Sequence, residues 1–316
     1  MSKKTSIIMP CYNHEKYVGS AIESVLNQTY GNIELIAIDN KSTDSTTKII
    51  KKFEKQDNRV VAIYHEKNVG LINSMNEGLE HISGDYISLI SSDDLFWPGK
   101  TAEQVSALES NPGFDVVHSD ADIIDGEGKK SGKTIKDFYR MTAKEAGGDI
   151  FLPLTRKNLC CTSTIIFKKE CLSTCGAFDP ELHYAQDWWF FLKLAEKHKF
   201  LYMDKVLADY RIHATNLTRN VDLVYADYVT IHSRLADMGI EPKSHLMTKA
   251  FSLAILGKTE DARAAVAAAK KHGKLGIQEN LVAFIINNFK NSRPLLLGIN
   301  KYRHSLMNSL YGLRRG

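Results

Sequence analysis

The sequence predicts an α/β fold, a mostly parallel, doubly wound sheet followed by a C-terminal helical extension. Strand-like and helix-like segments alternate over the first 120 residues, and this β-α-β rhythm favours parallel strands. After about residue 219 only helical patterns remain. We therefore expect a sheet domain over residues 1–218 and a helical region over residues 219–316.

Short apolar runs define the expected strands, at 6–9, 33–38, 60–64, 86–90 and 115–118. Helical spacing lies between them, at 15–27, 46–53, 70–81 and from Pro98 to about residue 108. In the later part of this domain, the pattern of apolar residues predicts a strand at 161–167, a buried helix at 186–198 and two short strands at 200–203 and 206–210.

The composition is that of an ordinary soluble globular protein, with 316 residues, 43% apolar and 25% charged. No window has the roughly 18 consecutive apolar residues of a membrane span, and the N-terminus does not resemble a signal peptide. The five cysteines include no CxxC pair, which disfavours a zinc knuckle. We expect reduced thiols and a cytoplasmic protein.

Positive charge is concentrated near the C-terminus. Residues 241–316 hold 13 Lys and Arg against 4 Asp and Glu, although the whole chain carries only +4. Such a surplus suits an anionic surface, so we expect peripheral contact with the inner face of the membrane through 241–316, or a homo-oligomer. A solvated basic face without a partner is the alternative, and nucleic acid is not an expected partner.

Two adjacent carboxylates, Asp93 and Asp94, follow the buried strand at 86–90. Open α/β sheets bind their ligands at the carboxyl edge, where these acids lie. The turn after the first strand contains neither GxGxxG nor GxxxxGK[ST], which disfavours a dinucleotide site and excludes a P-loop. A divalent cation held by carboxylates is the remaining way to bind phosphate oxygens.

Seven motifs occur in order, at residues 6–13 (SIIMPCYN), 21–30 (AIESVLNQTY), 39–46 (DNKSTDST), 68–70 with 76–78 (NVG, NEG), 84–94 (GDYISLISSDD), 176–179 with 185–187 (GAFD, AQD) and 210–213 (YRIH). Together they resemble the family 2 glycosyltransferases, nucleotide-sugar enzymes of the GT-A fold, over roughly residues 4–215. Each motif is weak alone, but seven in order are specific.

The resemblance implies a nucleotide site at the first strands. Asp39 would accept the imide N–H of uracil, and Tyr12 would stack on the base. The alternatives are a helix-capping acid for Asp39 and simple packing for Tyr12. The remaining implied nucleotide-binding residues are Pro10, Asn13, Asn68 and Ser92.

The resemblance also implies a metal and diphosphate site. Asp93 and His213 would hold Mn²⁺ or Mg²⁺, while Asp94, Gln186 and Arg211 would lie at the diphosphate or the acceptor. The alternatives are an N-cap for the helix after Pro98 and a structural histidine. Ser91 replaces the first acid of the DxD motif, which weakens the negative field on the metal, and Asn40 and Lys41 replace the usual acid and glycine.

Asp187 is the candidate catalytic base. The family places a carboxylate here that takes the proton of the acceptor hydroxyl. The N-terminus of a helix lowers a carboxyl pKa, whereas apolar neighbours such as Trp188 raise it, and the sequence does not decide between them. A helix-capping aspartate is the alternative.

The predicted function is inverting transfer of a hexosyl or hexosaminyl group from a nucleotide diphosphate donor, expected to be UDP-linked. The expected acceptor is a hydroxyl of a glycan or lipid-linked saccharide in surface polysaccharide synthesis. Two alternatives are a non-catalytic sugar-nucleotide or glycan-binding relative with a degenerate DxD, and a nucleotidyltransferase. The second would need a Gly-rich basic loop after the first strand, which residues 10–14 do not provide.

Overall fold

The computed structural model describes residues 3–142, 146–214, 216, 220–240, 243–289 and 291–298. Contacts divide the chain into two compact units. The first comprises Met1–Pro180 and Gln186–His213, and the second comprises Glu181–Ala185 and Ala214–Gly316. The boundary expected at residue 218 lies outside the described residues, as does the C-terminal end of the basic region from residue 299.

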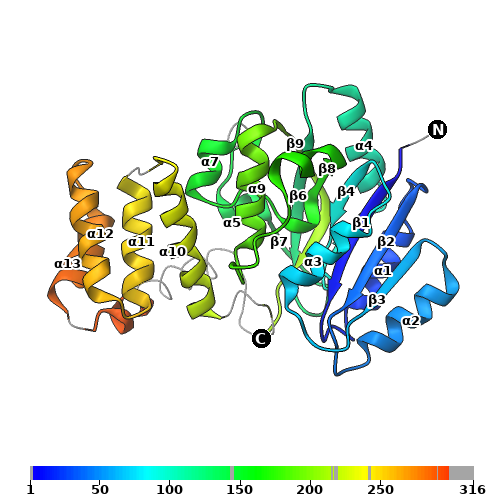
Figure 1. Ribbon diagram of the computed structural model, residues 1–316, viewed down its shortest axis with the longest axis horizontal. Helices are drawn as coiled ribbons and strands as arrows, with labels where there is room; N and C mark the ends of the chain where they lie inside the picture. Colours follow the sequence, from blue (N-terminus) through cyan, green and yellow to red (C-terminus); the bar gives the residue numbers. More distant parts are fainter. Residues whose placement is uncertain are drawn as a thin grey trace. The chain divides into compact units, whose positions relative to one another are not determined.

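One mixed sheet forms the centre of the first unit, in the order β3-β2-β1-β4-β8-β6-β9-β5, with β7 paired to β6 (Figure 1). The strands are β1 (Thr5–Cys11), β2 (Ile33–Asp39), β3 (Val60–Tyr64), β4 (Tyr86–Leu89), β5 (Leu95–Phe96), β6 (Val116–Ile124), β7 (Lys130–Thr134), β8 (Ile165–Lys168) and β9 (Phe200–Arg211). The first four are parallel neighbours, as their alternation with helices predicts. Beyond them, β8 is antiparallel to both β4 and β6, while β6 and β9 are parallel.

The helices of this unit are α1 (Val18–Leu26), α2 (Thr46–Gln56), α3 (Leu71–Glu80), α4 (Lys100–Ser110), α5 (Ile135–Tyr139), α7 (Phe151–Arg156), α8 (Leu172–Cys175) and α9 (Gln186–Lys197), with 3₁₀ turns η1 (Thr162–Thr164) and η2 (Lys169–Cys171). Helices α1 and α2 share one hydrophobic cluster with Ile7 and Met9 of β1. The intervening Ile8 points to the other face and meets Gly78 of α3, where an added Cβ would lie 2.6 Å from the Ile8 side chain. Helices therefore cover both faces of the parallel half, which explains why β2 is buried along its whole length.

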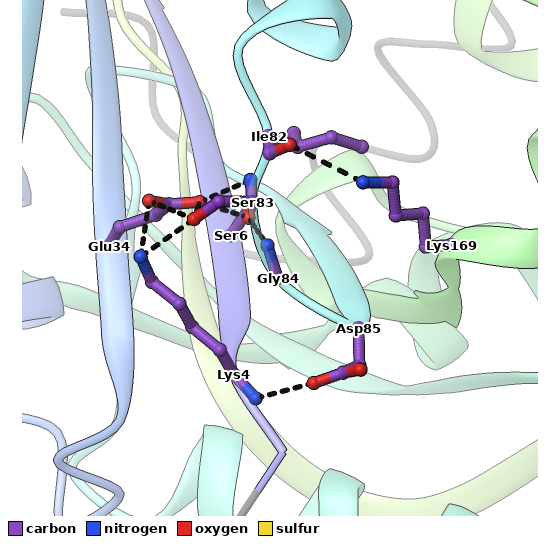
Figure 2. A network of polar contacts seen from close by, with 8 residues as sticks. All are labelled: Lys4, Ser6, Glu34, Ile82, Ser83, Gly84, Asp85 and Lys169. Carbon is purple, nitrogen blue, oxygen red and sulfur yellow. Dashed lines mark hydrogen bonds and ion pairs between the residues drawn. The ribbon is translucent and has the colours of Figure 1, made fainter.

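A polar network joins the amino ends of β1, β2 and β4 (Figure 2). The carboxylate of Glu34 accepts hydrogen bonds from Lys4 Nζ at 2.6 Å and from the backbone N–H of Ser83 at 2.7 Å, and Ser6 also donates to it. Burial raises the pKa of Glu34, but these hydrogen bonds outweigh it and hold the pKa at about 2. Gly84 is required beside this network, because a Cβ there would lie 2.7 Å from the Lys4 carbonyl oxygen.

The structure differs from the expected elements in two places that matter for the site. The segment expected as a strand at 161–167 begins as the 3₁₀ turn η1, and β8 starts only at Ile165. The two short strands expected at 200–203 and 206–210 form one strand, β9, whose register with β6 shifts between Met203 and Val206. The polar pair Asp204 and Lys205 lies in this bulge, so their polarity marks a bulge and not a break.

The second unit is built from α10 (Val221–Asp237), α11 (Lys243–Ile255), α12 (Thr259–Lys271) and α13 (Ile277–Asn288), as the helical patterns predict. These helices share a core of their own, which includes Leu246, Ile255, Val266 and Ile286. In the described part of the chain, none of the helices combines the length and the apolar character needed to cross a bilayer.

Candidate active site

Three potential metal ligands gather where β4 ends. His213 Nε2 lies 2.8 Å from Asp93 Oδ2, and one ligand atom each of His14, Asp93 and His213 lies within 4.8 Å of the others. His213 and Asp93 are buried and His14 is partly buried. A carboxylate and two imidazoles are a donor set that suits Mn²⁺ and other divalent transition metals. The structure thus brings together the two predicted metal residues and adds a third.

His14 is the residue that sequence reasoning missed. Its Nδ1 lies 2.8 Å from Ser92 Oγ, which orients the ring. Burial lowers the pKa of the imidazole below its usual value, which favours the neutral form that binds metal ions. The only available signal was its place in the turn after β1, at the same sheet edge as Asp93.

Arg211 holds the neighbouring loops. Its Nε donates to the Asp93 carbonyl oxygen at 2.6 Å, and its Nη1 donates to the Asp125 carbonyl oxygen at 3.1 Å. Its guanidinium lies over the ring of Tyr17, 4.9 Å from the centroid, and that ring in turn packs against His213 at 4.8 Å. The Arg211 guanidinium therefore packs on the ring of Tyr17, which in turn contacts His213, one of the three potential metal ligands.

Asp94 is fully buried and lies beside Asp93 in the chain. Its Oδ2 accepts from Ser163 Oγ at 2.6 Å, and its Oδ1 accepts from the backbone N–H of Arg211 at 2.8 Å. Burial, and then the charge of Asp93, raise the pKa of Asp94 well above its usual value. Both carboxylate oxygens thus bond to the protein, and they tie β9 to η1.

Asp187 lies in the first turn of α9. Its Oδ2 accepts from Thr162 Oγ1 at 3.1 Å and from Asn158 at 3.4 Å, and its Oδ1 accepts from the Trp188 N–H at 2.7 Å. Burial raises the pKa of this carboxyl to about 6, even though the three hydrogen bonds lower it. The effect of burial on the pKa therefore outweighs that of the hydrogen bonds.

The turn η1 joins the two acidic segments. Thr162 donates to Asp187, and the next residue, Ser163, donates to Asp94 and accepts from the Ser91 N–H at 3.1 Å. Consecutive Cα atoms are about 3.8 Å apart. Asp94 and Asp187, which are almost a hundred residues apart in the sequence, are therefore hydrogen-bonded to two adjacent residues of η1.

Four of the predicted nucleotide residues, Pro10, Tyr12, Asn13 and Asp39, lie at or just after the carboxyl ends of β1 and β2. Pro10 is in β1 opposite Ile38, and the Asp39 carboxylate accepts from Thr47 Oγ1 at 2.6 Å and from the Ser42 N–H at 3.3 Å. These bonds resemble the capping alternative, but a carboxylate has about four acceptor positions, and these two bonds do not use all of them.

Two more of these residues shape the first turn. Asn13 adopts a left-handed backbone conformation, with φ of 53°, and its Oδ1 accepts from the Thr43 N–H at 2.7 Å. This bond ties the first turn to the loop after β2. The ring of Tyr12 is 44% exposed, so it presents a face on which a base can stack.

Asn68 lies beside this turn, in a network with Asn40. The Asn40 Nδ2 donates to Asn68 Oδ1 at 3.0 Å, and the Asn40 Oδ1 accepts from the Val69 N–H at 2.8 Å. His65 contacts Asn40 as well, with its Nδ1 at 3.1 Å. Asn40, which replaces the usual acid, therefore holds the loop that carries Asn68.

Gln186 precedes Asp187 and is buried. Its Oε1 has no hydrogen-bond partner among the residues that the structure describes. Because an unsatisfied buried amide oxygen is costly, this atom is suited to accept a hydrogen bond from a bound ligand.

Comparisons with known proteins show what the chain is similar to. The family model described as glycosyl transferase family 2 matches residues 6–172. An uncharacterized glycosyltransferase of Rickettsia typhi is 30% identical over 221 residues, which cover 69% of this chain and 66% of the relative. Glycosyltransferase GlyG of Streptococcus pneumoniae is 33% identical over 139 residues, 44% of each chain. The chain thus spans two thirds or less of the length of these relatives.

Two solved structures share the fold. S. aureus TarS 1–349 in complex with UDP-GlcNAc has a TM-score of 0.64 and 18% identity, and the match covers 96% of this chain and 92% of TarS. Mannosyltransferase PcManGT from Pyrobaculum calidifontis, in complex with GDP-Man and Mn²⁺, has a TM-score of 0.62 and 18% identity, over 99% and 89% of the two chains.

The fold is the GT-A fold of these solved glycosyltransferases, which confirms the predicted fold class. More specifically, the chain belongs to glycosyl transferase family 2, as the order of its motifs predicts.

Proposed function

We propose that this protein transfers a hexosyl or hexosaminyl group, with inversion, from a nucleotide diphosphate sugar to a hydroxyl group of a glycan or lipid-linked acceptor in surface polysaccharide synthesis. The observation that carries the proposal is the link through η1. This turn bonds the partly exposed Asp187 and also Asp94, the neighbour of Asp93 in the chain. The Asp93 carboxylate in turn lies close to the imidazoles of His14 and His213.

His14, Asp93 and His213 would hold Mn²⁺ or Mg²⁺. Their closely spaced donor atoms and the lowered pKa of the His14 imidazole fit such an ion, and two imidazoles favour Mn²⁺ over Mg²⁺. When bound, the cation supplies Lewis-acid stabilisation of the charge on the departing diphosphate.

The donor is proposed to be UDP-linked. Asp39 would accept the imide N–H of uracil with an acceptor position that Thr47 and Ser42 leave open. Tyr12 would stack on the base, with Pro10, Asn13, Asn68 and Ser92 around the nucleoside. The TarS complex with UDP-GlcNAc supports a UDP donor, whereas the PcManGT complex with GDP-Man makes a guanine nucleotide the competing donor.

Asp187 would be the catalytic base. The acceptor oxygen attacks the anomeric carbon from the face opposite the diphosphate, the bond from carbon to the diphosphate oxygen breaks, and the hydroxyl proton passes to Asp187. A pKa of about 6 keeps Asp187 ionised at pH 7 and basic enough to take that proton. Gln186 would orient the acceptor or the diphosphate through its Oε1, while Asp94 and Arg211 would support the diphosphate side.

We further propose that the protein acts in the cytoplasm at the inner face of the membrane. All five cysteines are free thiols, which fits a reducing compartment. On α13, Ile277, Leu281 and Phe284 are 92%, 51% and 58% exposed and share one helix face by their spacing.

The same end of the second unit is basic. Lys270, Lys271 and Lys274 line a hollow that includes residues of the turn before Ile277. Exposed apolar side chains flanked by lysines match a surface of anionic lipid head groups. Vesicles with anionic lipid should bind the wild type and not Phe284→Ser, whereas concentration-dependent dimerisation without vesicle binding would show that a second copy covers this face.

The transferase proposal is tested by donor binding and turnover. A thermal-shift panel of nucleotide sugars with Mn²⁺ identifies the donor, since a ligand of the native state raises Tm. Asp187→Asn should abolish release of the nucleoside diphosphate and keep donor affinity. Asp204→Asn, which changes an exposed carboxylate paired with Lys136, is the matched control. Donor binding with no turnover in the wild type would favour the non-catalytic relative, and full turnover by Asp187→Asn would refute the base.

A further inference from the structure

One buried carboxylate of the second unit binds three consecutive backbone N–H groups. Asp227, on α10, is only 3% exposed. Its Oδ2 accepts from the N–H groups of His183, Tyr184 and Ala185 at 2.8, 2.6 and 2.8 Å. Hydrogen bonds to a carboxylate are about twice as strong as neutral ones, so this is a firm attachment.

Two other residues of α10 contact the same short segment. Arg234 Nη2 lies 2.6 Å from the Glu181 carboxylate, and the rings of Tyr228 and Tyr184 lie 6.5 Å apart between centroids. Asp227 and Arg234 are seven residues apart, which places them on one face of the helix. Residues 181–185 accordingly belong with the second unit, although the chain on either side of them belongs with the first.

The held segment is covalently continuous with the start of α9. Ala185 is followed directly by Gln186 and Asp187. A displacement of about 1 Å in a reacting group can cost about a hundredfold in rate, so the backbone just before the base needs a fixed path. Since these N–H groups precede α9, no helical hydrogen bond of α9 constrains them.

We propose that Asp227 is a positioning residue for catalysis, which fixes the segment 183–185 and thereby the place of Gln186 and Asp187. The inference rests on the proposed role of Asp187. The contacts of Asp227 with residues 183–185 lie within the second unit, and the effect on Gln186 and Asp187 passes through the chain itself.

The test compares Asp227→Asn with Asp222→Asn in the full-length protein. Asp222 is on the same helix, and its carboxylate pairs with Arg293 at 2.8 Å and is largely exposed. Asparagine keeps the shape of the side chain and removes its charge. We expect Asp227→Asn to lower kcat about 10- to 100-fold while the donor Kd changes less than about twofold. Asp222→Asn should match the wild type in both.

Hydrogen exchange of the peptide that contains residues 183–185 is the second readout. Exchange should quicken at these amides in Asp227→Asn and stay slow in Asp222→Asn. Arg234→Gln, which removes the ion pair with Glu181, covers the case in which Asp227→Asn does not fold, and it should quicken exchange there to a smaller degree.

The proposal is overturned if exchange in Asp227→Asn and in Arg234→Gln equals that of the wild type, if kcat of Asp227→Asn is unchanged, or if its kcat and donor affinity fall together. Failure of the proposed function is distinguishable, because exchange needs no turnover. A wild type that is inactive with every donor would refute the transferase proposal, while the exchange data would still decide whether Asp227 holds the segment.

Discussion

The acidic limb of the pH–rate profile tests the proposed base most directly. The perturbation is a fall in pH from 7 to 5 in the wild type, repeated in Thr162→Val. Burial raises the pKa of Asp187 to about 6, and only the ionised carboxylate can take a proton. Turnover should therefore be lost as the pH falls through about 6.

The magnitude follows from that pKa. A base with a pKa of about 6 is about 90% ionised at pH 7 and about 10% ionised at pH 5, so kcat should fall about tenfold. A carboxyl with the ordinary aspartate pKa would lose less than about 10% over the same range. Thr162→Val removes a hydrogen bond that favours the ionised form, so it should move the midpoint upward by about 0.5 to 1 unit.

The assay measures release of the nucleoside diphosphate at saturating donor and Mn²⁺ between pH 5 and 8. Metal affinity itself depends on pH, so Mn²⁺ binding is measured over the same range by titration calorimetry. Thr162→Val separates the two effects, because Thr162 bonds Asp187 and belongs to no metal-ligand group in the described chain. A kcat that stays flat down to pH 5, or an unmoved midpoint in Thr162→Val, would refute the reasoning.

Three further predictions concern other parts of the first unit. Asp39→Ala should weaken UDP binding about tenfold in calorimetry, because one charged hydrogen bond is lost, and an unchanged Kd would contradict the base contact. His14→Gln should weaken Mn²⁺ binding by the donor-free protein at least about tenfold, whereas His81→Gln, outside the metal cluster, should not. Glu34→Gln should cost up to about 3 kcal/mol of unfolding free energy at pH 7, since the Glu34 pKa falls from 4.5 to about 2 on folding. A carboxyl whose pKa is lowered by folding stabilises the native state at pH values above its unfolded-state pKa. In urea titrations the difference in unfolding free energy between the wild type and Glu34→Gln should therefore shrink as the pH falls from 4.5 towards 2. A pH-independent difference would contradict this expectation.

Several parts of the fold and the site were predictable because their signals are local. A strand covered on both faces is apolar along its length, so β1, β2 and β4 could be placed from runs of apolar residues. Asp39 and Asp93 follow such runs, and parallel strands bring their carboxyl ends to one edge. The buried helix α9 was predicted from its aromatic residues, within one residue of its end.

Other features escaped prediction because their signals are not local. Asp204 and Lys205 have the polarity of a loop, yet they form a bulge in β9 because β6 continues beside them. The 3₁₀ turn η1 carries the hydroxyls that bind Asp94 and Asp187, and both of these carboxylates are distant from it in the sequence. Hydrogen bonds between distant residues set these conformations.

By itself, the sequence determined the parallel half of the sheet, the acids at its carboxyl edge, and the family, because periodicity and motif order are properties of neighbouring residues. Tertiary structure alone decided that His14 joins Asp93 and His213, that burial raises the pKa of Asp187, and that Asp227 holds the segment before α9. These outcomes depend on which side chains meet across 40 to 200 residues of chain and on how much water they exclude, and packing in three dimensions sets both.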